Sequence, residues 1–514
     1  MFSSIISGTI HGIRSLLIQV EVDVSKGLPC FQMVGLLGSE VREARERVKV
    51  ALKNAGMPLP PMCINVNLSP ADVRKSGALF DLPVAVGILE ALGFLPKESA
   101  KDIVIVGELG LDGEVKPVRG VLPIVREAKA QGIRHCIVPQ GNAAEGAVVQ
   151  GIEIIGVSDI RQAIGYLHAS EEERQEQVMP RLDVPALLRS RQECLELDFA
   201  DVSGQESVKR AAEIAAAGFH HFLMIGAPGS GKTMIAKRMP SILPPLSIEE
   251  SMEVSAIYSI AGMLPQDEVL MSRRPFIAPH HLTTKQALAG GGKVVSPGMV
   301  TLAHRGILFL DEMPEFKRET LDVLRQPLED KKIQIARSSG TYHYPADFML
   351  VGAMNPCPCG YHPNPHKCRC TPHEVHCYQQ RISGPILDRI DICVETPVME
   401  ISGLEGKSIQ ECSKQIRERV IAARDRQEAR FVGTQLCFNA DMGVKDIKKH
   451  CLLGSHERKL LEQAFTALQL TARSYHRILK VARTIADLAG EERIREEHLA
   501  EAICYRVTES KFMT

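Results

Sequence analysis

The sequence contains no tryptophan, and aromatic residues make up only 4% of its 514 positions. So few aromatic side chains argue against a surface built mainly for stacking on nucleic-acid bases. The sequence also lacks an uninterrupted apolar run of about eighteen residues, which a membrane span would require. The apolar residues among positions 1–20 are interrupted by His11 and Arg14, and this segment does not have the pattern of a secretory leader. We therefore expect a cytoplasmic protein without a membrane partner.

An excess of charge of either sign is absent as well, because 61 lysines and arginines are balanced by 62 aspartates and glutamates. The net charge of -1 excludes a protein that coats polyanions through bulk positive charge, but it leaves room for a local basic loop. Fourteen cysteines are present, and in a reducing cytoplasm clustered thiols favour a metal site over disulfides.

The 514 residues are enough for about three or four domains. Residues 1–167 mix strand and helix patterns, and residues 168–194 are rich in charge and lack a sustained apolar stripe, which predicts a linker. Residues 195–400 alternate short apolar strands with helices. Residues 401–514 have helical patterns only. The predicted fold is therefore an N-terminal α+β domain, an α/β core and a small C-terminal helical lid.

The prediction for the core rests on three continuous apolar runs, at 222–226, 306–310 and 348–354. Such runs are typical of parallel strands that are covered on both faces, and the helices between them predict a doubly wound parallel sheet. The lid helices are expected near residues 408–430, 455–470, 474–489 and 494–506.

The strongest motif is GAPGSGKT, which directly follows the first of these runs and opens a helix. Glycines let backbone N–H groups curl around phosphate oxygens, and the helix N-terminus adds a positive dipole. Lys232 is expected to reach the β- and γ-phosphates of ATP, and the Thr233 hydroxyl is expected to ligate Mg²⁺. The predicted nucleotide-binding residues are Gly226, Ala227, Pro228, Gly229, Ser230, Gly231, Lys232 and Thr233.

Polar residues end the next two apolar runs. Asp311 and Glu312 follow the run at 306–310, where an aspartate is placed to hold Mg²⁺ and a glutamate to polarise an attacking water. Asn355 follows the run at 348–354, where a neutral amide can hold that water next to the γ-phosphate. An asparagine before proline is by itself usually a turn former, but the order of the three motifs favours a catalytic site.

With these motifs in place, the sequence resembles the AAA+ ATPases, and specifically the magnesium-chelatase-like ComM/YifB family, over nearly its whole length. The resemblance implies an ATP- and Mg²⁺-dependent ring, expected to be a homo-hexamer, that acts on branched or single-stranded DNA. It implies helicase or branch-migration activity in homologous recombination and natural transformation. The stretches that carry it are DVSGQE (201–206), APHH (278–281), GGG (290–292), LDEMPEF (310–316), GPILDRID (384–391) and KVARTIADL (480–488).

The resemblance also implies roles for three residues of the motor. Asn355 corresponds to sensor 1, Arg389 to a finger that reaches into a neighbouring subunit, and Arg473 to sensor 2 in the lid. An arginine supplied by a neighbour couples hydrolysis to ring assembly, because negative charge develops on the transferred phosphoryl group. Arg381 is the alternative to Arg389, which could instead form a structural pair with an adjacent aspartate. Arg477 is the alternative to Arg473.

Residues 103–138 resemble the proteolytic domain of Lon-type proteases, an α+β fold of the ribosomal S5 domain 2-like type. In the alignment, Leu79 occupies the position of the serine nucleophile and Leu122 that of the lysine base. Neither side chain can attack a peptide or accept a proton. Lys75 and Ser76 are sequence neighbours in an extended segment and make a poor dyad. We therefore expect a protease-like fold without proteolysis.

The segment CPCGYHPNPHKCRC begins a Cys-rich insertion over residues 357–377. Its two Cys-x-Cys pairs can supply four thiolates to a closed, tetrahedral Zn²⁺ site. Metal-free thiols in a surface loop are the alternative. The predicted ligands are Cys357, Cys359, Cys368 and Cys370, and the neighbours that could replace one of them are His362, His366, His373, His376 and Cys377.

A polar, β-prone segment just before residue 348 carries Lys331, Lys332 and Arg337. The resemblance places a hairpin here that can face the central pore, where basic side chains would follow DNA phosphates with little sequence preference. An ordinary solvated hairpin is the alternative. Lys293 and Arg305 are weaker candidates for DNA contact.

Three other functions compete with a DNA motor. A metal-chelatase motor would need a partner domain with a D-x-S-x-S metal site, which this sequence does not contain. A scaffolding ring, in which nucleotide merely locks the subunits together for partner proteins, would not need Glu312 and Arg389, whereas a chaperone-like AAA+ ATPase that remodels a protein partner stays an alternative. An ATP-dependent protease is disfavoured by Leu79 and Leu122.

Overall fold

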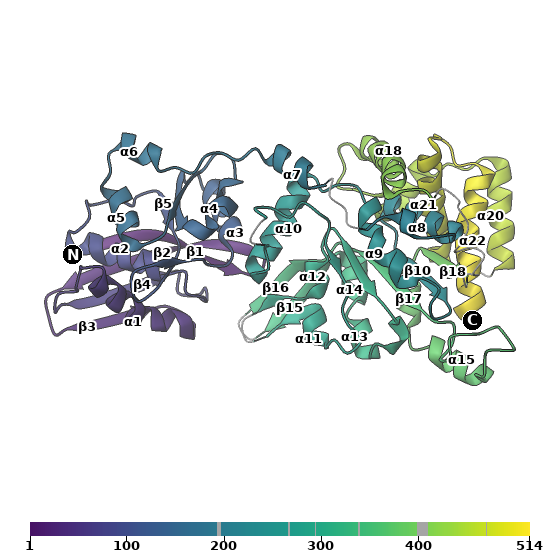
Figure 1. Cartoon of the computed structure of the whole chain (residues 1–514), viewed down its shortest axis with the longest axis horizontal. Helices are drawn as coiled ribbons and strands as arrows, with labels where there is room; N and C mark the ends of the chain where they lie inside the picture. Colours follow the sequence, from purple (N-terminus) through teal and green to yellow (C-terminus); the bar gives the residue numbers. More distant parts are fainter. Residues whose placement is uncertain are drawn as a thin grey trace.

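The computed structural model describes residues 1–192, 197–265, 268–292, 295–337, 340–397, 410–468 and 470–513. Among these residues no helix is both long and apolar enough to cross a membrane. The N-terminal region lies at one end of the longest axis of the molecule, and the C-terminal helices lie beside the core at the other end, with α18 (Ser413–Phe431) next to α8 (Glu206–Gly218) (Figure 1).

The N-terminal region is built on a mixed seven-stranded sheet in the order β3-β4-β2-β1-β5-β8-β9. Every second residue of β2 is buried from Ile18 to Val24, as a strand with one covered face requires. The strands are β1 (Phe2–His11), β2 (Arg14–Ser25), β3 (Cys30–Val34), β4 (Cys63–Ser69), β5 (Ile103–Ile105), β8 (His135–Pro139) and β9 (Glu153–Val157), with a small β6 (Glu108–Leu109) and β7 (Val115–Lys116) pair beside them.

Helices pack on this sheet through apolar stripes. In α1, the side chains of Val41, Ala44, Val48 and Leu52 lie on one face and are fully buried, as their helical spacing predicts. The helices of the region are α1 (Ser39–Asn54), α2 (Asp81–Leu92), α3 (Val121–Ala130), α4 (Gln140–Ala147) and α5 (Ile160–His168).

The segment expected to be a linker contains helices. It forms α6 (Glu171–Glu176), which begins with a capping box at Ser170, and α7 (Val184–Gln192). Val184 and Leu188 are buried in the N-terminal core. Two apolar residues one turn apart are enough to hold a short helix on an existing hydrophobic surface, although they do not make a sustained stripe.

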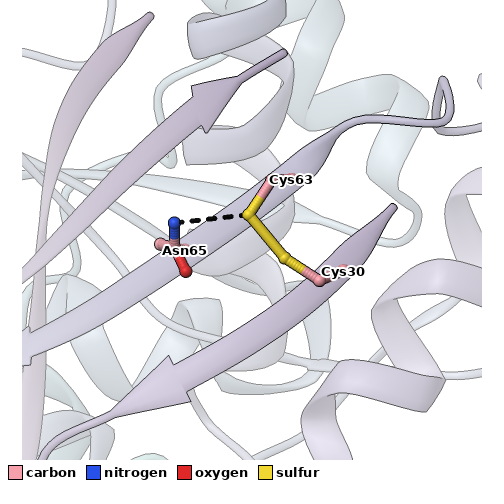
Figure 2. The surroundings of a disulfide bond; sticks show 3 residues. All are labelled: Cys30, Cys63 and Asn65. Atoms are coloured by element: carbon pink, nitrogen blue, oxygen red, sulfur yellow. Dashed lines mark hydrogen bonds between the residues drawn. A yellow bond between two sulfur atoms is a disulfide. The ribbon is translucent and has the colours of Figure 1, made fainter. Parts of the chain in front are cut away.

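A disulfide joins Cys30 of β3 to Cys63 of β4 (Figure 2). The two residues are register partners on these parallel strands. This pair was not predicted, because the preference for a metal site concerned clustered thiols, whereas the proximity of Cys30 and Cys63 arises from strand register and leaves no signature in the spacing of the cysteines.

The core is a five-stranded parallel sheet in the order β11-β14-β17-β10-β18, which confirms the predicted α/β fold. Its strands are β10 (Phe222–Gly226), β11 (Phe276–Ile277), β14 (Ile307–Leu310), β17 (Met349–Met354) and β18 (Ile392–Thr396). Its helices are α8 (Glu206–Gly218), α9 (Lys232–Ile242), α10 (Ile248–Ala261), α11 (Lys285–Ala289), α12 (Met299–Leu302), α13 (Arg318–Asp322), α14 (Arg325–Asp330), α15 (Pro372–Gln379) and α16 (Gly384–Leu387).

The N-terminal region and the core meet at α10 and at a β-hairpin, among other places. Helix α10 packs on α3, and the Ser259 hydroxyl of α10 donates a hydrogen bond to the buried carboxylate of Glu145. The hairpin of β15 (Lys332–Arg337) and β16 (Gly340–Pro345) meets the turn between β1 and β2, where the rings of Tyr342 and His11 stack with centroids 4.7 Å apart. The hairpin is thus fixed against the N-terminal region.

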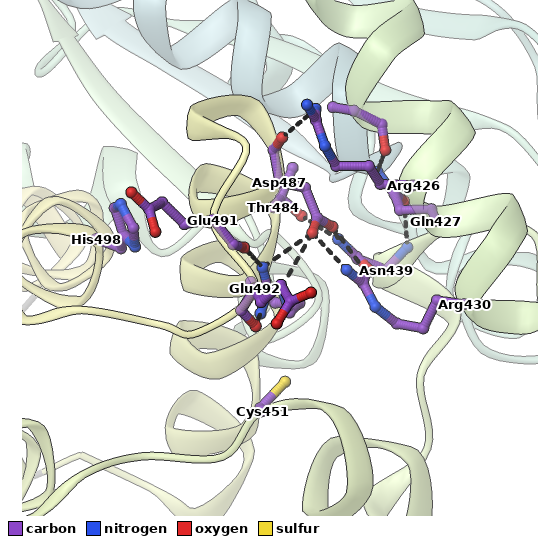
Figure 3. Close-up of polar contacts among 12 residues, drawn as sticks. Arg426, Gln427, Arg430, Asn439, Cys451, Thr484, Asp487, Glu491, Glu492 and His498 are labelled. Atoms are coloured by element: carbon purple, nitrogen blue, oxygen red, sulfur yellow. Dashed lines mark hydrogen bonds and ion pairs between the residues drawn. The ribbon is translucent and has the colours of Figure 1, made fainter.

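The C-terminal lid is helical, as predicted, with α18 (Ser413–Phe431), α19 (Val444–His450), α20 (Ser455–Ala467), α21 (Ala472–Ala489) and α22 (Glu496–Met513). A buried polar cluster holds it together (Figure 3). The fully buried Asp487 accepts hydrogen bonds from Arg430 at 2.8 Å, from Arg483 at 3.1 Å and from Asn439 at 2.8 Å. Removing one partner would leave a buried charge unpaired, so the cluster fixes how α18 and α21 pack.

Candidate active site

The GAPGSGKT segment forms a tight turn between the end of β10 at Gly226 and the start of α9 at Lys232. Gly229 and Gly231 have φ angles of +76° and +86°, which side chains with a Cβ rarely adopt. The turn therefore presents backbone N–H groups at a helix N-terminus, the arrangement that fits phosphate oxygens.

Lys232 is buried within this turn, with 8% of its surface exposed. Its ammonium donates to the carbonyl oxygens of Gly226 and Ala227 at 2.7 and 2.9 Å, and to Oδ1 of Asn355 at 3.3 Å. Burial lowers the pKa of Lys232 to about 8, and the negative charge of Asp311 opposes this shift only in part. The structure thus brings together the lysine and the asparagine that the sequence singled out.

The acidic pair lies at the same edge of the sheet. Thr233 donates its hydroxyl hydrogen to Oδ2 of Asp311 at 2.7 Å. Glu312 is exposed and has a φ angle of +48°, a strained conformation for a residue with a side chain and one that is common at functional sites. The hydroxyl and carboxylate oxygens of Thr233 and Asp311 are the hard ligands that Mg²⁺ prefers, so this donor set fits the ion.

Gln205 is part of the site and was not among the predicted residues. It donates from Nε2 to the carbonyl oxygen of Ser230 at 3.2 Å and to that of Pro397 at 2.8 Å. Among the residues that the structure describes, its buried Oε1 has no hydrogen-bond partner. An acceptor left over beside the phosphate turn fits a ligand with an N–H donor, such as an adenine amino group. Gln205 lies in the DVSGQE stretch, which was its only signal.

The two predicted arginines lie together, in a second location. Arg389 and Arg473 line one cavity of about 370 Å³, which none of Lys232, Asp311 and Asn355 lines. Arg389 donates to the Pro385 carbonyl at 2.5 Å and pairs with Glu329, so its partner is not one of the adjacent aspartates.

The side chain of Arg473 is 67% exposed, and its pair with Asp388 spans 3.8 Å. A pair so exposed and so long contributes little stability.

The two competing arginines have structural partners. Arg381 pairs with Glu315 at 3.0 Å. Arg477 is largely buried, contacts Asp391 at 3.6 Å and donates to the Ile390 carbonyl at 3.1 Å. Burial lowers the pKa of Arg477 to about 10. Both side chains are thus occupied within the chain.

Asp391 is the centre of a buried network that connects β18 to the lid. Burial opposes its charge, but the hydrogen bond from His220 and the charge of Arg477 hold the pKa of Asp391 well below its usual range. The other ring nitrogen of His220 lies 2.8 Å from the Thr484 hydroxyl on α21. The segment that carries Arg389 is therefore linked to the lid helix that carries Arg473.

The basic residues proposed for DNA contact are not equivalent. Lys331 ends α14 and pairs with Asp347 at 3.2 Å and with Asp441 of the lid, so it joins the core to the lid. Lys332 and Arg337 are exposed at the two ends of β15.

Of the two weaker candidates, Arg305 is paired with Asp347 at 3.0 Å and with Glu253 at 3.2 Å. Lys293 lies outside the described residues.

The four predicted thiols converge. The sulfur atoms of Cys357, Cys359, Cys368 and Cys370 lie within 4.8 Å of one another. Three of the separations are 3.4, 3.8 and 3.6 Å, close to the edge of about 3.8 Å that a tetrahedron has when its metal–sulfur distance is about 2.3 Å. Cys377 lies near His373 instead, at 3.5 Å. The donor set fits Zn²⁺.

The protease-like region contains no dyad at the aligned positions. Leu79 and Leu122 are both buried in the N-terminal core, with 6% and 0% of their surfaces exposed. Lys75 is also buried, and its ammonium donates to the Pro70 carbonyl.

A parallel sheet with a glycine-rich phosphate turn, an acidic strand end, a polar strand end and a helical lid defines a P-loop protein of the AAA+ class. The family model described as magnesium chelatase, subunit ChlI, matches residues 198–404. Two further models of that subunit match residues 20–142 and, for its C-terminal part, 410–506.

Individual proteins give the same result. Competence protein ComM of Haemophilus influenzae is 40% identical over 500 residues, which cover 96% of this chain and 95% of that protein. YifB of Escherichia coli is 40% identical over 500 residues, with the same coverage. Lon protease 2 of Bacillus subtilis is 31% identical over 120 residues, 23% of this chain and 21% of that protease. The chain belongs to the magnesium-chelatase-like ComM/YifB family.

Proposed function

We propose that this protein is an ATP-driven DNA motor that works as a ring of identical subunits, expected to be a hexamer. Its activity is that of a helicase or branch-migration factor in homologous recombination and natural transformation. The observation that supports this proposal best is the convergence of Lys232, Thr233, Asp311 and Asn355 at the carboxyl ends of neighbouring parallel strands. The role in transformation follows from the similarity to Competence protein ComM.

The position of each residue in the nucleotide site suits a particular chemical role. The ammonium of Lys232 exchanges its carbonyl partners for β- and γ-phosphate oxygens, whose charge it neutralises. Thr233 and Asp311 hold Mg²⁺, which offsets the negative charge that develops on the phosphates. Glu312 accepts the proton of the attacking water, and the Asn355 amide orients that water.

The two arginines act on the nucleotide of a neighbouring subunit. This reading is supported by the cavity that holds Arg389 and Arg473, since the residues of the phosphate turn do not line it. A guanidinium placed there stabilises the charge of the transition state only when two subunits meet. The network around Asp391 would pass that event to the lid.

Mixing two inactive variants tests this arrangement. Lys232→Ala and Arg389→Ala subunits should each be inactive alone, whereas a random mixture should recover about a quarter of the interfaces, because each variant supplies what the other lacks. ATP turnover in the mixture is the measurement. Full turnover by monomers at high dilution would contradict a shared site.

DNA contact is assigned to the β15–β16 hairpin, with Lys332 and Arg337 as its exposed charges. We also assign a structural Zn²⁺ to the four thiols of the Cys-rich insertion, because their spacing matches a closed tetrahedral site.

The experiment that tests the proposal is strand displacement on a three-stranded DNA junction. The native protein should displace the strand with ATP, and Glu312→Gln should bind nucleotide but not displace it. ATP turnover should rise with branched or single-stranded DNA and stay flat with casein or porphyrin. An equal response to every DNA form would instead favour the remodelling of a protein partner, and stimulation by porphyrin would favour a chelatase motor.

A further inference from the structure

The thiol cluster is connected directly to the proposed nucleotide site. Asn355, whose amide oxygen contacts Lys232, is followed by Pro356 and then by Cys357. Cys357 is completely buried, and the Pro356 carbonyl accepts a hydrogen bond from the buried Gln379 of α15 at 3.0 Å. A displacement of the cluster would therefore move Asn355 as well.

The same cluster also packs against the phosphate turn. Gly360 is buried with a φ angle of +84°, and a Cβ added to it would lie 2.7 Å from Cγ of Pro228 and closer still to Cδ. The backbone of the Cys-rich loop thus touches the proline ring of the GAPGSGKT turn. Gly360 is fixed by its own N–H, which donates to the Cys357 carbonyl at 3.0 Å. The Cys357 sulfur accepts from the His362 N–H at 3.4 Å.

A third contact reaches the acidic segment. Helix α15 begins just after Cys370, at a capping box formed by Thr371 and Glu374. Beyond its end, Arg381 pairs with Glu315, three residues after Glu312. The segment from Pro356 to Arg381 therefore adjoins the asparagine, contacts the phosphate turn, and pairs with the residues that follow the acidic strand end.

We infer that a thiophilic divalent cation, with Zn²⁺ as the first choice, binds the four thiolates and controls the affinity of the ATP site by holding Gly360 against Pro228. This inference rests on the proposed nucleotide site. On binding, the four thiols release their protons to solvent and the metal joins the two Cys-x-Cys pairs across the loop. Without the metal, backbone hydrogen bonds such as that from Gly360 to Cys357 remain, but the two Cys-x-Cys pairs are no longer tied to one ion, so the support of the phosphate turn on that side is weakened.

Metal exchange on the full-length protein tests the inference first. The protein is purified with Zn²⁺, stripped with a chelator under reducing conditions and reloaded with Zn²⁺, and zinc content is measured at each stage. The dissociation constant of a fluorescent, non-hydrolysable ATP analogue should rise by about tenfold on stripping and return on reloading, because a small shift of a phosphate-binding turn costs this much or more. Thermal melting records whether the stripped protein stays folded.

A variant that keeps the metal separates position from folding. Gly360→Ala should retain one equivalent of zinc but bind the ATP analogue more weakly, because the new methyl group pushes on Pro228. Gly433→Ala is the matched control, because Gly433 has a similar φ angle of +79° but nothing within 4 Å of an added Cβ. Replacing Pro228 by alanine in the Gly360→Ala background removes the clashing ring atoms and should restore part of the affinity.

The outcomes distinguish this inference from the proposed motor. One outcome is that ATP turnover depends on DNA but the affinity for the analogue does not change with zinc or with Gly360→Ala. This outcome overturns the inference and leaves the proposed motor function intact. Zinc-dependent analogue binding without ATP hydrolysis overturns the motor and supports the inference. Protein that binds no zinc when reloaded, or no nucleotide in any state, overturns the inference.

Discussion

The N-terminal region and the core are both α/β structures with helices packed on a sheet, but they differ at the positions where chemistry would occur. In the protease-like region those positions hold Leu79 and Leu122, which are buried among other apolar side chains. In the core, the positions expected to be catalytic hold charged residues such as Lys232 and Asp311, which lie together at the edge of the sheet. The comparison teaches that a fold can keep its packing after its catalytic groups are gone, so function has to be argued from the site.

The two regions also differ in how they use buried polar groups. Beside Leu122, the Glu145 carboxylate accepts hydrogen bonds from the Leu122 N–H at 3.0 Å, from Asn142 at 2.9 Å and from Ser259 of α10. The bond from Ser259 joins the N-terminal region to the core. In the core, Lys232, Asn355 and Gln205 form hydrogen bonds at the phosphate turn, and Oε1 of Gln205 has no partner among the described residues.

Of the substitutions that distinguish the two regions, Lys232→Ala in the core is expected to have the largest effect, a loss of ATP turnover. Removing the charge that faces the phosphates should lower ATP turnover by more than about a hundredfold, as the loss of a transition-state donor does elsewhere. Lys237→Ala, on an exposed position of the same helix, is the control and should keep near-normal turnover. Steady-state phosphate release measures both. Normal ATP turnover by Lys232→Ala would contradict the assignment of the ATP site to the core.

In the N-terminal region a substitution should change stability instead. Leu122→Ala should lower the free energy of unfolding by about 3 kcal/mol, since it opens a cavity in a packed core. Denaturant titration of the full chain measures this, with the exposed Leu111→Ala as a control that stays within about 0.5 kcal/mol of the native protein. Cleavage of casein by the native protein would contradict the loss of protease chemistry.

The lowered pKa of Lys232 predicts a pH dependence confined to the core. Burial shifts this pKa from 10.5 to about 8, and a bound triphosphate should restore the charged form. Above about pH 8 the free protein must then take up a proton on binding, so ATP affinity should fall by up to tenfold per pH unit and stay flat below pH 8.

Titration calorimetry in buffers of different ionisation enthalpy measures this proton uptake. Lys232→Arg, whose guanidinium stays charged, should lose the dependence, and its persistence there would assign the proton to another group.

The smallest effect is expected at the hairpin that bridges the two regions. Lys332→Ala with Arg337→Ala should leave turnover without DNA unchanged and reduce the salt dependence of DNA binding by about one unit of slope for each charge removed. Fluorescence anisotropy over a salt series provides the slope. Lys129→Ala, exposed on α3, is the matched control. An unchanged slope in the double variant would place the DNA contact elsewhere.

Much of the core could be predicted because its signals are local. The three apolar runs became β10, β14 and β17, and Asp311 and Asn355 follow two of them directly. Parallel strands end at one edge of a sheet, so residues that follow them meet there. The four cysteines were found for a similar reason, since their pairs are close in sequence.

Other features could not be predicted because they depend on pairings between distant segments. The disulfide from Cys30 to Cys63 follows from strand register, and the bond from Gln205 to Pro397 spans nearly two hundred residues. The helices in the expected linker form because Val184 and Leu188 find an apolar surface on the N-terminal core.

By itself, the amino-acid sequence determined the fold class, the phosphate turn and the acidic strand end, since each depends on neighbouring residues with strong steric or chemical preferences. Only the tertiary structure decided that Arg389 and Arg473 share one cavity, that Lys331 joins core to lid, and that Gly360 rests on Pro228. Those contacts arise when separate elements pack, and the energy of packing depends on shapes that no single segment specifies.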